Sequence, residues 1–474
     1  MSYQPRLFPF NFHRFSDEDV LAISSSGDYE YLTQIELETL VNEPEKLDLK
    51  LLADLKSKFF LAENNASGSL RLLKSRIAAQ KETVLGGPSL HMIVPTLECE
   101  HTCKYCQVSR SLRDDKYVMT EENIDVACDT IFQSPSETIT VEFQGGDPLL
   151  RFDLVKRAIE RIYRRNQSEA RSIRFVVAST LHQLTEEMCE FFKEFNVFLS
   201  TSLDGPEVLH NKNRPLPTKD SYKKTINAIN QARNILGPDS VSALMTTTSE
   251  SLKYPDEIVD EYVSQGLSDI FIRPLSLYGF AKRNEKKLSH DEDLFHEFYL
   301  KAFERVLYWN RKGIQIREAT AALLFNKILS PFDAGYVDLQ SPSGAGLGAV
   351  LYNYDGYVYP GDEARMLAEM GDTSLRLGKV GDKLSVLLES PVISNIIESS
   401  LSYQIPTCSS CAFNPYCGPD PIAAYNTFGS MNTPVHLTEH CGRHMKLFDY
   451  FFKKLKENDP WFLNLAREWG NSNI

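Results

Sequence analysis

Through the middle of the chain, apolar and polar residues follow a repeated strand-then-helix pattern. Short, almost continuously apolar runs alternate with longer stretches in which apolar residues recur at helical spacing. The predicted strands span 90–96, 138–143, 173–179, 197–203, 241–247 and 270–275, and the predicted helices span 121–133, 152–165, 185–195, 221–236 and 254–265. Apolar strands that alternate with helices are typical of a parallel sheet covered by helices. The pattern therefore predicts an α/β fold, and six units indicate a partial (β/α)6 barrel rather than a closed eightfold one.

The pattern differs on either side of this core. Residues 20–32 form two β-prone arms around Ser-Gly-Asp, and helical spacing follows at 36–41 and 47–61. After a helical region over 291–329, residues 348–365 form a hairpin rich in Gly and Tyr. We therefore expect a small α+β, winged-helix-like domain at 1–63, a linker with one short helix at 64–88, the barrel at 89–335 and a smaller domain at 336–474.

Composition and charge exclude several classes of protein. The 474 residues suffice for about three domains, and 42% hydrophobic residues exclude global disorder. The formal net charge of −13 gives no general attraction to phosphate, so we expect neither nucleic acid nor an anionic membrane as partner. The N-terminal aromatics are interrupted by polar residues, and no later run approaches the roughly 18 apolar residues of a membrane span. We therefore expect a cytoplasmic protein.

Most cysteines fall into two groups. Of the nine, Cys128 and Cys189 stand alone among apolar neighbours and are expected to be core residues. The groups are Cys99, Cys103 and Cys106, and Cys408, Cys411, Cys417 and Cys441. At this low density, in a reducing compartment, clustered thiols are more typical of metal ligands than of disulfides.

The first group has the spacing C-x3-C-x2-C directly after the first barrel strand, where a β/α barrel places its catalytic groups. Three thiolates can hold three corners of a four-iron, four-sulfur cluster and leave one iron without a protein ligand. An open metal position indicates chemistry rather than a structural role. The alternative is a zinc knuckle that lacks one ligand, for which His101 would give an unusual spacing.

The second group has the spacing C-x2-C-x5-C, and Cys441 follows 24 residues later. Four thiolates close a coordination site, so this set cannot bind a substrate through a free iron. Such a set is as typical of structural zinc as of an iron–sulfur cluster, and the residues alone leave both readings open.

Several segments together resemble one family. With Tyr105 before its last cysteine, the first group resembles the signature of the radical S-adenosylmethionine (radical SAM) superfamily, and the second resembles the SPASM extension of peptide-modifying radical enzymes. Over nearly the whole chain, the order of segments is similar to the radical SAM maturase of the His-Xaa-Ser repeat peptide system. The segments are FHRF, CQVSR, VEFQGGDPLL, STSLDGP, ALMTTT, IRPLSLYGFA, YNYDGYVY, DEARMLAEMGD and CSSCAFNPYCGPDP.

The resemblance implies a radical SAM barrel that binds S-adenosylmethionine and a SPASM-like domain, with one 4Fe-4S cluster on the first cysteine group and one auxiliary 4Fe-4S cluster on the second. The expected contacts to S-adenosylmethionine are Tyr105, Gly145, Gly146, Asp147, Ser179, Thr180, Ser202 and Arg214. In this chain Asp147 replaces the Glu of the family's Gly-Gly-Glu-Pro segment, which leaves a side-chain role less defined. Taken singly, each of these positions is also typical of a turn or a strand-end cap.

The resemblance also implies a reaction and its partners. A precursor peptide with His-Xaa-Ser repeats would lose a hydrogen atom and gain a cross-link or a double bond, with flavodoxin or ferredoxin as electron donor and a second radical SAM maturase alongside. Gly361 and Pro421 stand where the family's second auxiliary site would have cysteines, so that site is expected to be absent. Asp362 occupies the place of the proton acceptor of sulfatase-maturing enzymes; otherwise it is a surface carboxylate.

Three alternatives remain at this stage. Residues 1–63 resemble leader-recognition domains, which add a leader peptide as an extra strand, but they are also consistent with a subdomain that caps the barrel. The reaction could instead be the sulfatase-maturase type, which oxidises Ser or Cys to an aldehyde. A different class of protein, a non-catalytic zinc-binding peptide adaptor, would use the same cysteines without chemistry.

Overall fold

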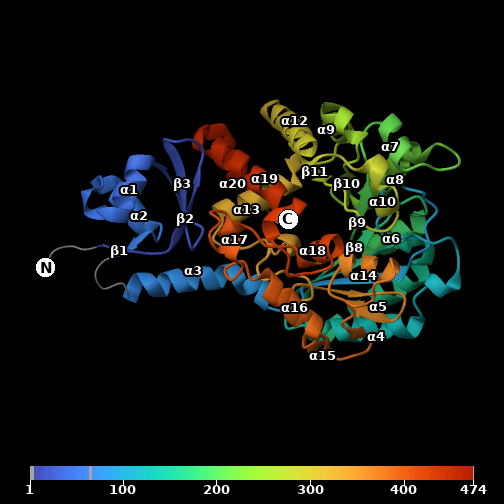
Figure 1. Ribbon diagram of the computed structural model, residues 1–474. Helices are drawn as coiled ribbons and strands as arrows, with labels where there is room; N and C mark the ends of the chain where they lie inside the picture. The colour runs from blue at the N-terminus through green and yellow to red at the C-terminus, as the bar shows by residue number, and fades with distance from the viewer. Residues whose placement is uncertain (1–4, 63–66, 473–474) are drawn as a thin grey trace. The chain divides into compact units, whose positions relative to one another are not determined.

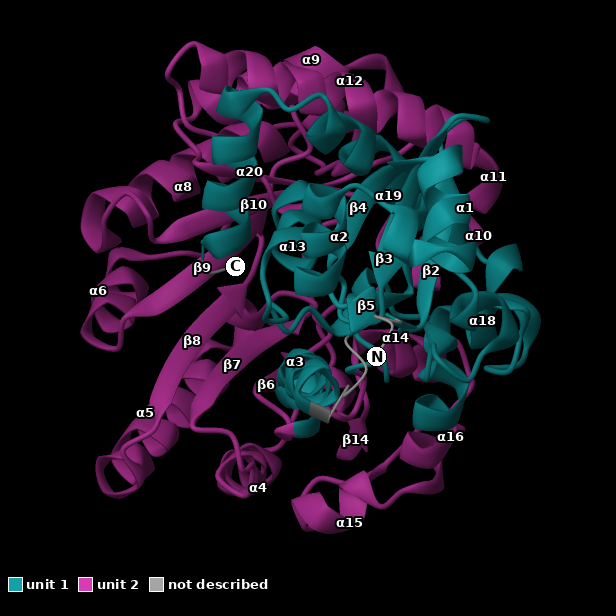
Figure 2. Cartoon of the chain, turned by 90° about the vertical axis from the view of Figure 1, so that its left-hand side faces the viewer, with its two compact units in different colours: residues 1–85, 321–344, 396–474 teal, residues 86–320, 345–395 magenta. Residues whose placement is uncertain are grey.

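The computed structural model describes residues 5–62 and 67–472 (Figure 1). Residues 1–4 of the expected N-terminal domain, and residues 63–66 where it meets the linker, lie outside the described part. The chain forms two compact units, coloured separately in Figure 2: residues 1–85, 321–344 and 396–474 form unit 1, and residues 86–320 and 345–395 form unit 2. The N-terminal segment and the second cysteine group therefore belong to one unit.

Unit 2 contains the barrel strands. In the described residues, a sheet of ten strands has the order β12-β11-β10-β9-β8-β7-β6-β13-β14-β15. Strands β6 to β11 are all parallel and adjacent in sequence order. They span Leu90–Thr96, Thr138–Gly145, Ser172–Ala178, Val197–Ser202, Val241–Thr246 and Asp269–Arg273. These are the six strands that the sequence predicts, with ends that differ by at most two residues, and the α/β prediction is confirmed.

Side chains on the two faces of these strands have different surroundings. On β7, Ile139, Val141 and Phe143 are fully buried, whereas Glu142 and Gln144 are only partly buried. Side chains of a strand alternate between the faces of its sheet, so one face carries the apolar layer and the other carries the polar groups. The helices of this unit that follow the barrel strands are α4 Glu121–Ile131, α5 Phe152–Glu169, α6 Glu186–Glu194, α7 Glu207–Asn213, α8 Ser221–Leu236, α9 Pro255–Ser264, α10 Gly279–Arg283, α11 Glu285–Leu288 and α12 Glu292–Arg311.

The Gly- and Tyr-rich hairpin extends the barrel sheet. Its strands are β13 (Ala349–Tyr352) and β14 (Tyr357–Tyr359), and β13 pairs in parallel with β6. All four residues of β13 are buried, which accounts for this central place. The hairpin therefore lies in unit 2, whereas the sequence analysis grouped it with the C-terminal domain. The remaining elements of this region are β12 Arg317–Glu318, β15 Gly378–Lys379, α14 Asp362–Glu369, α15 Leu384–Leu388 and α16 Pro391–Ser400.

Unit 1 begins with an antiparallel sheet in the order β2-β3-β4, spanning Phe10–Arg14, Asp19–Ser24 and Tyr29–Thr33. Strands β3 and β4 form the hairpin that the sequence predicts, and β2 is an additional strand. Thr33 caps helix α1 (Gln34–Asn42) through a reciprocal pair of bonds with Glu36, which sets where the helix begins. The other elements of the N-terminal segment are β1 Arg6–Leu7, β5 Leu61–Ala62, α2 Leu49–Ser57 and α3 Ser67–Leu85.

The rest of unit 1 is helical and carries the second cysteine group. Its helices are α13 Ala319–Leu329, α17 Pro406–Ser409, α18 Pro421–Phe428, α19 Glu439–Lys456 and α20 Pro460–Asn471. Phe325 of α13 packs edge to face on Phe451 of α19 and on Phe462 of α20, which joins these helices in one core. None of the described helices combines the length and the apolar character that crossing a membrane requires.

Candidate functional site

The first cysteine group lies on the loop that leaves the carboxyl end of β6. Backbone hydrogen bonds hold this loop at both ends: Cys99 N donates to Ser111 O at 3.2 Å, and Lys104 N donates to Asn213 O at 3.1 Å. Cys106 N donates to Cys103 O at 3.2 Å, which makes a tight turn between the last two cysteines. The three thiols are therefore held on a short, ordered segment above the parallel strands.

The donor set of this loop fits an iron–sulfur cluster. All three cysteines are free thiols, and Cys99 lines a cavity of about 630 Å³. Burial, Asp147 and the Cys103 and Cys106 thiols raise the pKa of Cys99, which shows that the three sulfurs share one neighbourhood. Burial raises the pKa of Cys103 to about 11. Because thiolates are the ligands of iron, metal binding here would release protons.

Gly145 and Gly146, at the end of β7, allow this strand to approach the cysteine loop. Gly145 has φ +125°, and a Cβ on it would lie 2.5 Å from Thr96 O; a Cβ on Gly146 would lie 2.2 Å from Glu98 O. Gly146 N donates to Thr96 O at 2.9 Å. These close contacts require glycine, because any side chain would separate the two segments. In this structure the two glycines therefore allow the cysteine loop to pack directly against the end of β7.

Asp147 joins three strand ends. Its carboxylate accepts a hydrogen bond from Ser179 Oγ at 2.6 Å and from Thr180 Oγ1 at 2.5 Å, beyond the end of β8. Its backbone N donates to Glu98 O at 2.6 Å. The Gly-Gly-Asp-Pro segment, Ser179 and Thr180 are thus brought together next to Cys99.

Tyr105 and Arg214 also meet. Arg214 Nη1 donates to Tyr105 OH at 2.8 Å, and the same hydroxyl donates to Asp204 at 2.8 and 2.9 Å. All three side chains are buried, and burial raises the pKa of Asp204 to about 6, although Arg214 lowers it. Ser202 ends β9 and pairs in register with Leu244. Sequence reasoning did not assign Asp204 a role, although it lies in the STSLDGP segment.

Buried polar atoms without partners mark the same end of the sheet. The hydroxyls of Thr201, on β9, and Thr247, directly after β10, have no hydrogen-bond partner in the described structure, and neither has His101 Nδ1. Thr201 lies on the same face of β9 as the buried Leu199 and on the opposite face from Ser202, so its unpaired hydroxyl does not indicate a ligand on the Ser202 side.

A short chain of histidines runs from the cysteine loop. His101 Nε2 lies 2.9 Å from His182 Nδ1, and His182 Nε2 lies 3.0 Å from Thr225 Oγ1. Burial lowers the pKa of His101 to about 2 and that of His182 to about 4, so both rings are neutral. Sequence reasoning missed His182, because nothing in its local sequence separates it from other polar residues.

Asp362 is the first residue of α14 and forms an ion pair with Arg365 one turn later. Arg365 is fully buried and also donates from Nη1 to Val108 O at 3.3 Å, in the segment after the first cysteine group. Glu142, on β7, is a further group near Asp362: burial and the Asp362 carboxylate raise its pKa to about 7, and Arg273 opposes this. The barrel side of this region therefore holds two carboxyl groups that sequence reasoning did not connect.

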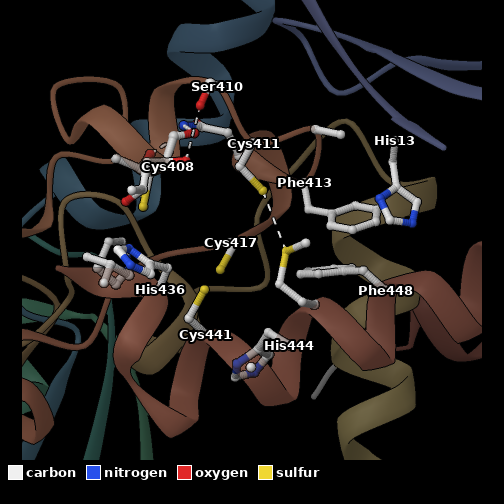
Figure 3. A pocket seen from close by; sticks show the side chains of 18 of the residues that line it. His13, Cys408, Ser410, Cys411, Phe413, Cys417, His436, Cys441, His444 and Phe448 are labelled. Atoms are coloured by element: carbon white, nitrogen blue, oxygen red, sulfur yellow. Dashed lines mark hydrogen bonds between the residues drawn. The ribbon is translucent and has the colours of Figure 1, made fainter.

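The second cysteine group surrounds a pocket in unit 1 (Figure 3). The pocket has a volume of about 410 Å³, and its walls include Cys408, Cys411, Cys417 and Cys441 together with His436, His440, His444, Met445, Phe413 and Phe448. Thr438 caps α19 by accepting from Cys441 N at 3.1 Å, which places this cysteine in the first turn of the helix. Segments far apart in sequence thus bring four thiols to one pocket.

The pocket offers the four thiols that a four-thiolate site needs, but these side chains are not drawn together around one point. The four cysteines are free, and burial raises the pKa of each thiol, that of Cys408 to about 11. Among the described residues, no three His, Cys, Asp or Glu side chains converge as ligands of a single metal ion would. Gly361 precedes α14 and Pro421 begins α18, so neither offers a ligating side chain. Cys128 and Cys189 are buried in α4 and α6, as expected for core residues.

Comparison with known protein families identifies the domain that carries the first cysteine group. Residues 93–262 match the model of the Radical SAM superfamily. This range contains the first cysteine group, Gly145 to Asp147, Ser179, Ser202 and Arg214, so the chain contains a radical SAM domain. Such a domain implies S-adenosylmethionine and a 4Fe-4S cluster.

Related sequences include two named enzymes. The cysteine-type anaerobic sulfatase-maturating enzyme of Clostridium novyi (strain NT) is 24% identical over 349 residues, which cover 69% of this chain and 87% of that enzyme. The serine-type enzyme of Bacteroides thetaiotaomicron is 28% identical over 28% of this chain and 33% of its own length. An uncharacterised protein of Methanothermobacter thermautotrophicus is 27% identical over 37% of this chain, and this match spans 64% of the relative's length.

Solved structures share the fold. anSMEcpe with bound AdoMet superposes with a TM-score of 0.64 at 17% identity, over 80% of this chain and 99% of that one. Streptococcus suis SuiB bound to precursor peptide SuiA superposes with a TM-score of 0.56 at 14% identity, over 91% of this chain and 99% of that one. At these identities the similarity establishes the fold.

Proposed function

We propose that this protein modifies a ribosomally made precursor peptide by removing a hydrogen atom from a side chain, and that the product gains a cross-link or a double bond. The observation that carries the proposal is the presence of two different cysteine sites: three thiols on the loop after β6, and four thiols around a separate pocket. An open site suits radical chemistry, whereas a closed site suits electron transfer.

Each part of the first site would have a distinct role. Cys99, Cys103 and Cys106 would hold a 4Fe-4S cluster. When bound, this cluster with S-adenosylmethionine supplies a 5′-deoxyadenosyl radical that removes a hydrogen atom from the substrate. Arg214 and Ser202 would bind the carboxylate of S-adenosylmethionine, the guanidinium through a charge-assisted hydrogen bond. The buried strand ends would keep water from the reacting carbon.

Contacts to the rest of the cofactor would come from the neighbouring strand ends. Tyr105 would orient Arg214, to which it is hydrogen bonded. The backbone at Gly145 and Gly146, Asp147 and the hydroxyls of Ser179 and Thr180 would line the amino-group and ribose side, where these residues already meet.

Two further groups would act on the product radical. Asp362 would accept the substrate proton, with Arg365 holding its carboxylate in place. Cys408, Cys411, Cys417 and Cys441 would hold one auxiliary 4Fe-4S cluster, which could take up the surplus electron. The absence of ligating side chains at Gly361 and Pro421 supports a single auxiliary cluster.

The proposed partners follow from the reaction. The substrate would be a precursor with His-Xaa-Ser repeats, and flavodoxin or ferredoxin would donate the electron, with a second radical SAM maturase acting on the same peptide. That SuiB binds its precursor peptide supports a peptide substrate here. The sheet β2-β3-β4 would dock the leader by strand addition. We place this reaction in the cytoplasm, where thiols remain reduced.

Anaerobic co-expression with the precursor peptide tests the proposal. Fragment mass spectrometry of the product should locate a loss of two hydrogens within the repeat region. An unmodified peptide, recovered from cells in which the enzyme retains its iron, would reject the proposal. A matched strain with Cys99, Cys103 and Cys106 changed to Ala should return unmodified peptide.

The second candidate is oxidation of Ser or Cys to an aldehyde, which the similarity to two sulfatase-maturating enzymes favours. Both reactions can remove two hydrogens, so mass alone separates them poorly. An aldehyde-reactive hydrazide separates them, because it labels only the product of the second reaction.

A further inference from the structure

Strand β2 of the N-terminal sheet contacts the loop that carries the second cysteine group. Asn11 Nδ2 donates to Ser409 O at 3.0 Å and to Cys411 O at 3.1 Å. One carboxamide group therefore donates both of its hydrogens to the cysteine loop, to the carbonyl of Ser409 next to Cys408 and to that of Cys411, 400 residues away in sequence.

The same strand contacts the helix that carries Cys441. His13 Nε2 lies 2.9 Å from Asp449 Oδ1 of α19, and the His13 ring lies 5.0 Å from the ring of Phe413, between Cys411 and Cys417. Figure 3 shows His13 and Phe413 side by side at the edge of the pocket. Contacts from β2 thus reach both of the segments that supply the four thiols.

The alternation of β2 explains how one strand serves two neighbours. Asn11 and His13 are two residues apart, so their side chains leave the same face of the strand. Phe10, on the other face, packs 5.5 Å from Phe60 in the core of the N-terminal domain. Packing within the N-terminal domain therefore fixes the position of β2. Through Asn11 and His13, the strand in turn holds the cysteine loop in place.

Two tyrosine hydroxyls strengthen the connection. Tyr416, beside Cys417, donates its hydroxyl to Gly27 O at 2.7 Å, in the turn between β3 and β4. Tyr31 of β4 donates to Phe452 O of α19 at 2.7 Å. Phe12 and His13 of β2 also line the pocket, so the N-terminal sheet is part of the wall of the cysteine site.

We propose that Asn11 and His13 are positioning residues for the second cysteine site, so that the N-terminal sheet sets the geometry of the group held there. The inference rests on the proposed auxiliary cluster. It gives residues 10–33 a role that a leader-docking domain or a barrel cap does not require. Because β2 is an edge strand of its sheet in the described residues, a peptide added beside it would act on the same contacts.

The test uses the anaerobically reconstituted full chain with Asn11→Leu and His13→Phe, which keep approximate shape and remove the hydrogen bonds. Amide hydrogen exchange across residues 406–417 should become about tenfold faster, as expected for the loss of one or two ordinary hydrogen bonds. In a background with Cys99, Cys103 and Cys106 changed to Ala, the electron paramagnetic resonance signal and midpoint potential of the remaining cluster should also change.

Asn42→Leu is the matched control, because Asn42 Nδ2 donates to Glu38 O on the exposed side of the same domain. The proposal would be overturned if Asn11→Leu and this control had the same amide exchange rates and the same electron paramagnetic resonance spectrum. If Asn11→Leu does not fold, Asn11→Asp replaces it, because this variant has the same size and lacks the amide donor hydrogens. Its amide exchange and its electron paramagnetic resonance signal then test the proposal. A wild-type protein without a second cluster would reject the proposed function, while the exchange measurement would still judge Asn11 and His13.

Discussion

Tyr105 and Asp204 form a buried hydrogen bond of 2.8 Å between the cysteine loop and the end of β9. Arg214 donates to the same phenolic oxygen, so a neutral hydroxyl lies between a carboxylate and a guanidinium. A buried ion pair is stable only when its remaining bonding capacity is satisfied. Tyr105 therefore links the cysteine loop to the charged side chains of Asp204 and Arg214.

The first prediction concerns this hydroxyl. Tyr105→Phe leaves Asp204 and Arg214 buried with one donor removed, so we expect a loss of about 1 to 3 kcal/mol in the free energy of unfolding. Denaturant unfolding measures the change. Tyr163→Phe is the control, because Tyr163 is 49% exposed on α5 and should cost little. Equal stability of the two variants would show that the Tyr105 hydroxyl contributes nothing.

The second prediction tests the radical site. Changing Cys99, Cys103 and Cys106 to Ala should abolish formation of 5′-deoxyadenosine, because the variant loses all three thiolates proposed to hold the reactive cluster. The fold should survive, since β6 and its neighbours do not depend on these thiols. Chromatography of the nucleoside products and circular dichroism provide the two readouts. Undiminished 5′-deoxyadenosine would remove these cysteines from the site.

The third prediction concerns Arg214. Arg214→Ala should weaken binding of S-adenosylmethionine by a few kcal/mol at most, about the strength of a lost charge-assisted hydrogen bond. Arg214→Lys keeps the positive charge but lacks the planar guanidinium. Its affinity for S-adenosylmethionine should therefore lie between that of the wild type and that of Arg214→Ala. Calorimetric titration of the reconstituted protein gives the dissociation constants. A constant unchanged in the Ala variant would exclude Arg214 from the binding site.

The fourth prediction concerns Asp362. Asp362→Asn should slow product formation while iron content stays normal, because the variant loses the proton acceptor. It also leaves the buried Arg365 without its carboxylate, so we expect unfolding to become easier by about 3 kcal/mol. Stopped assays that compare 5′-deoxyadenosine with peptide product separate the two effects. Product formation at the wild-type rate would leave Asp362 with a structural role alone.

The fifth prediction is a pH dependence from Glu142. Burial raises its pKa to about 7, above the value of an exposed glutamate, so the folded state keeps a proton that the unfolded state loses. The contribution of Glu142 to stability is therefore full at low pH and declines as pH rises from about 4.5 to 7, by on the order of 2 to 3 kcal/mol. Glu142→Gln should remove this decline, whereas Glu190→Gln, at an exposed position, should retain it. Parallel pH profiles for wild type and Glu142→Gln would contradict the assignment.

The number of clustered cysteines predicts the iron content of the reconstituted protein. Seven clustered thiols can hold two cubanes, so the reconstituted chain should carry about eight iron atoms, and the change of Cys408, Cys411, Cys417 and Cys441 to Ala should leave about four. A value near twelve would reveal a further site, and a value near four with one zinc would make the second set structural.

Local pattern was sufficient for much of the fold. Continuous apolar strands and amphipathic helices repeat along the barrel region, so the six parallel strands from Leu90 to Arg273 could be predicted to within two residues. The spacing of Cys99, Cys103 and Cys106 could be read in the same way, because all three ligands lie on one loop.

Tertiary structure decided what depends on contacts between distant residues. Strand β13 joins β6 in the barrel sheet, although the paired residues Leu90 and Ala349 lie 259 positions apart, and no periodicity records such a pairing. Asp204 gains its significance from Tyr105 on the cysteine loop and Arg214 after α7, Glu142 from Asp362 on α14, and Asn11 from a carbonyl 400 residues away. A sequence determines periodicity and ligand spacing locally, whereas desolvation and pairing across the fold arise only when the chain has packed.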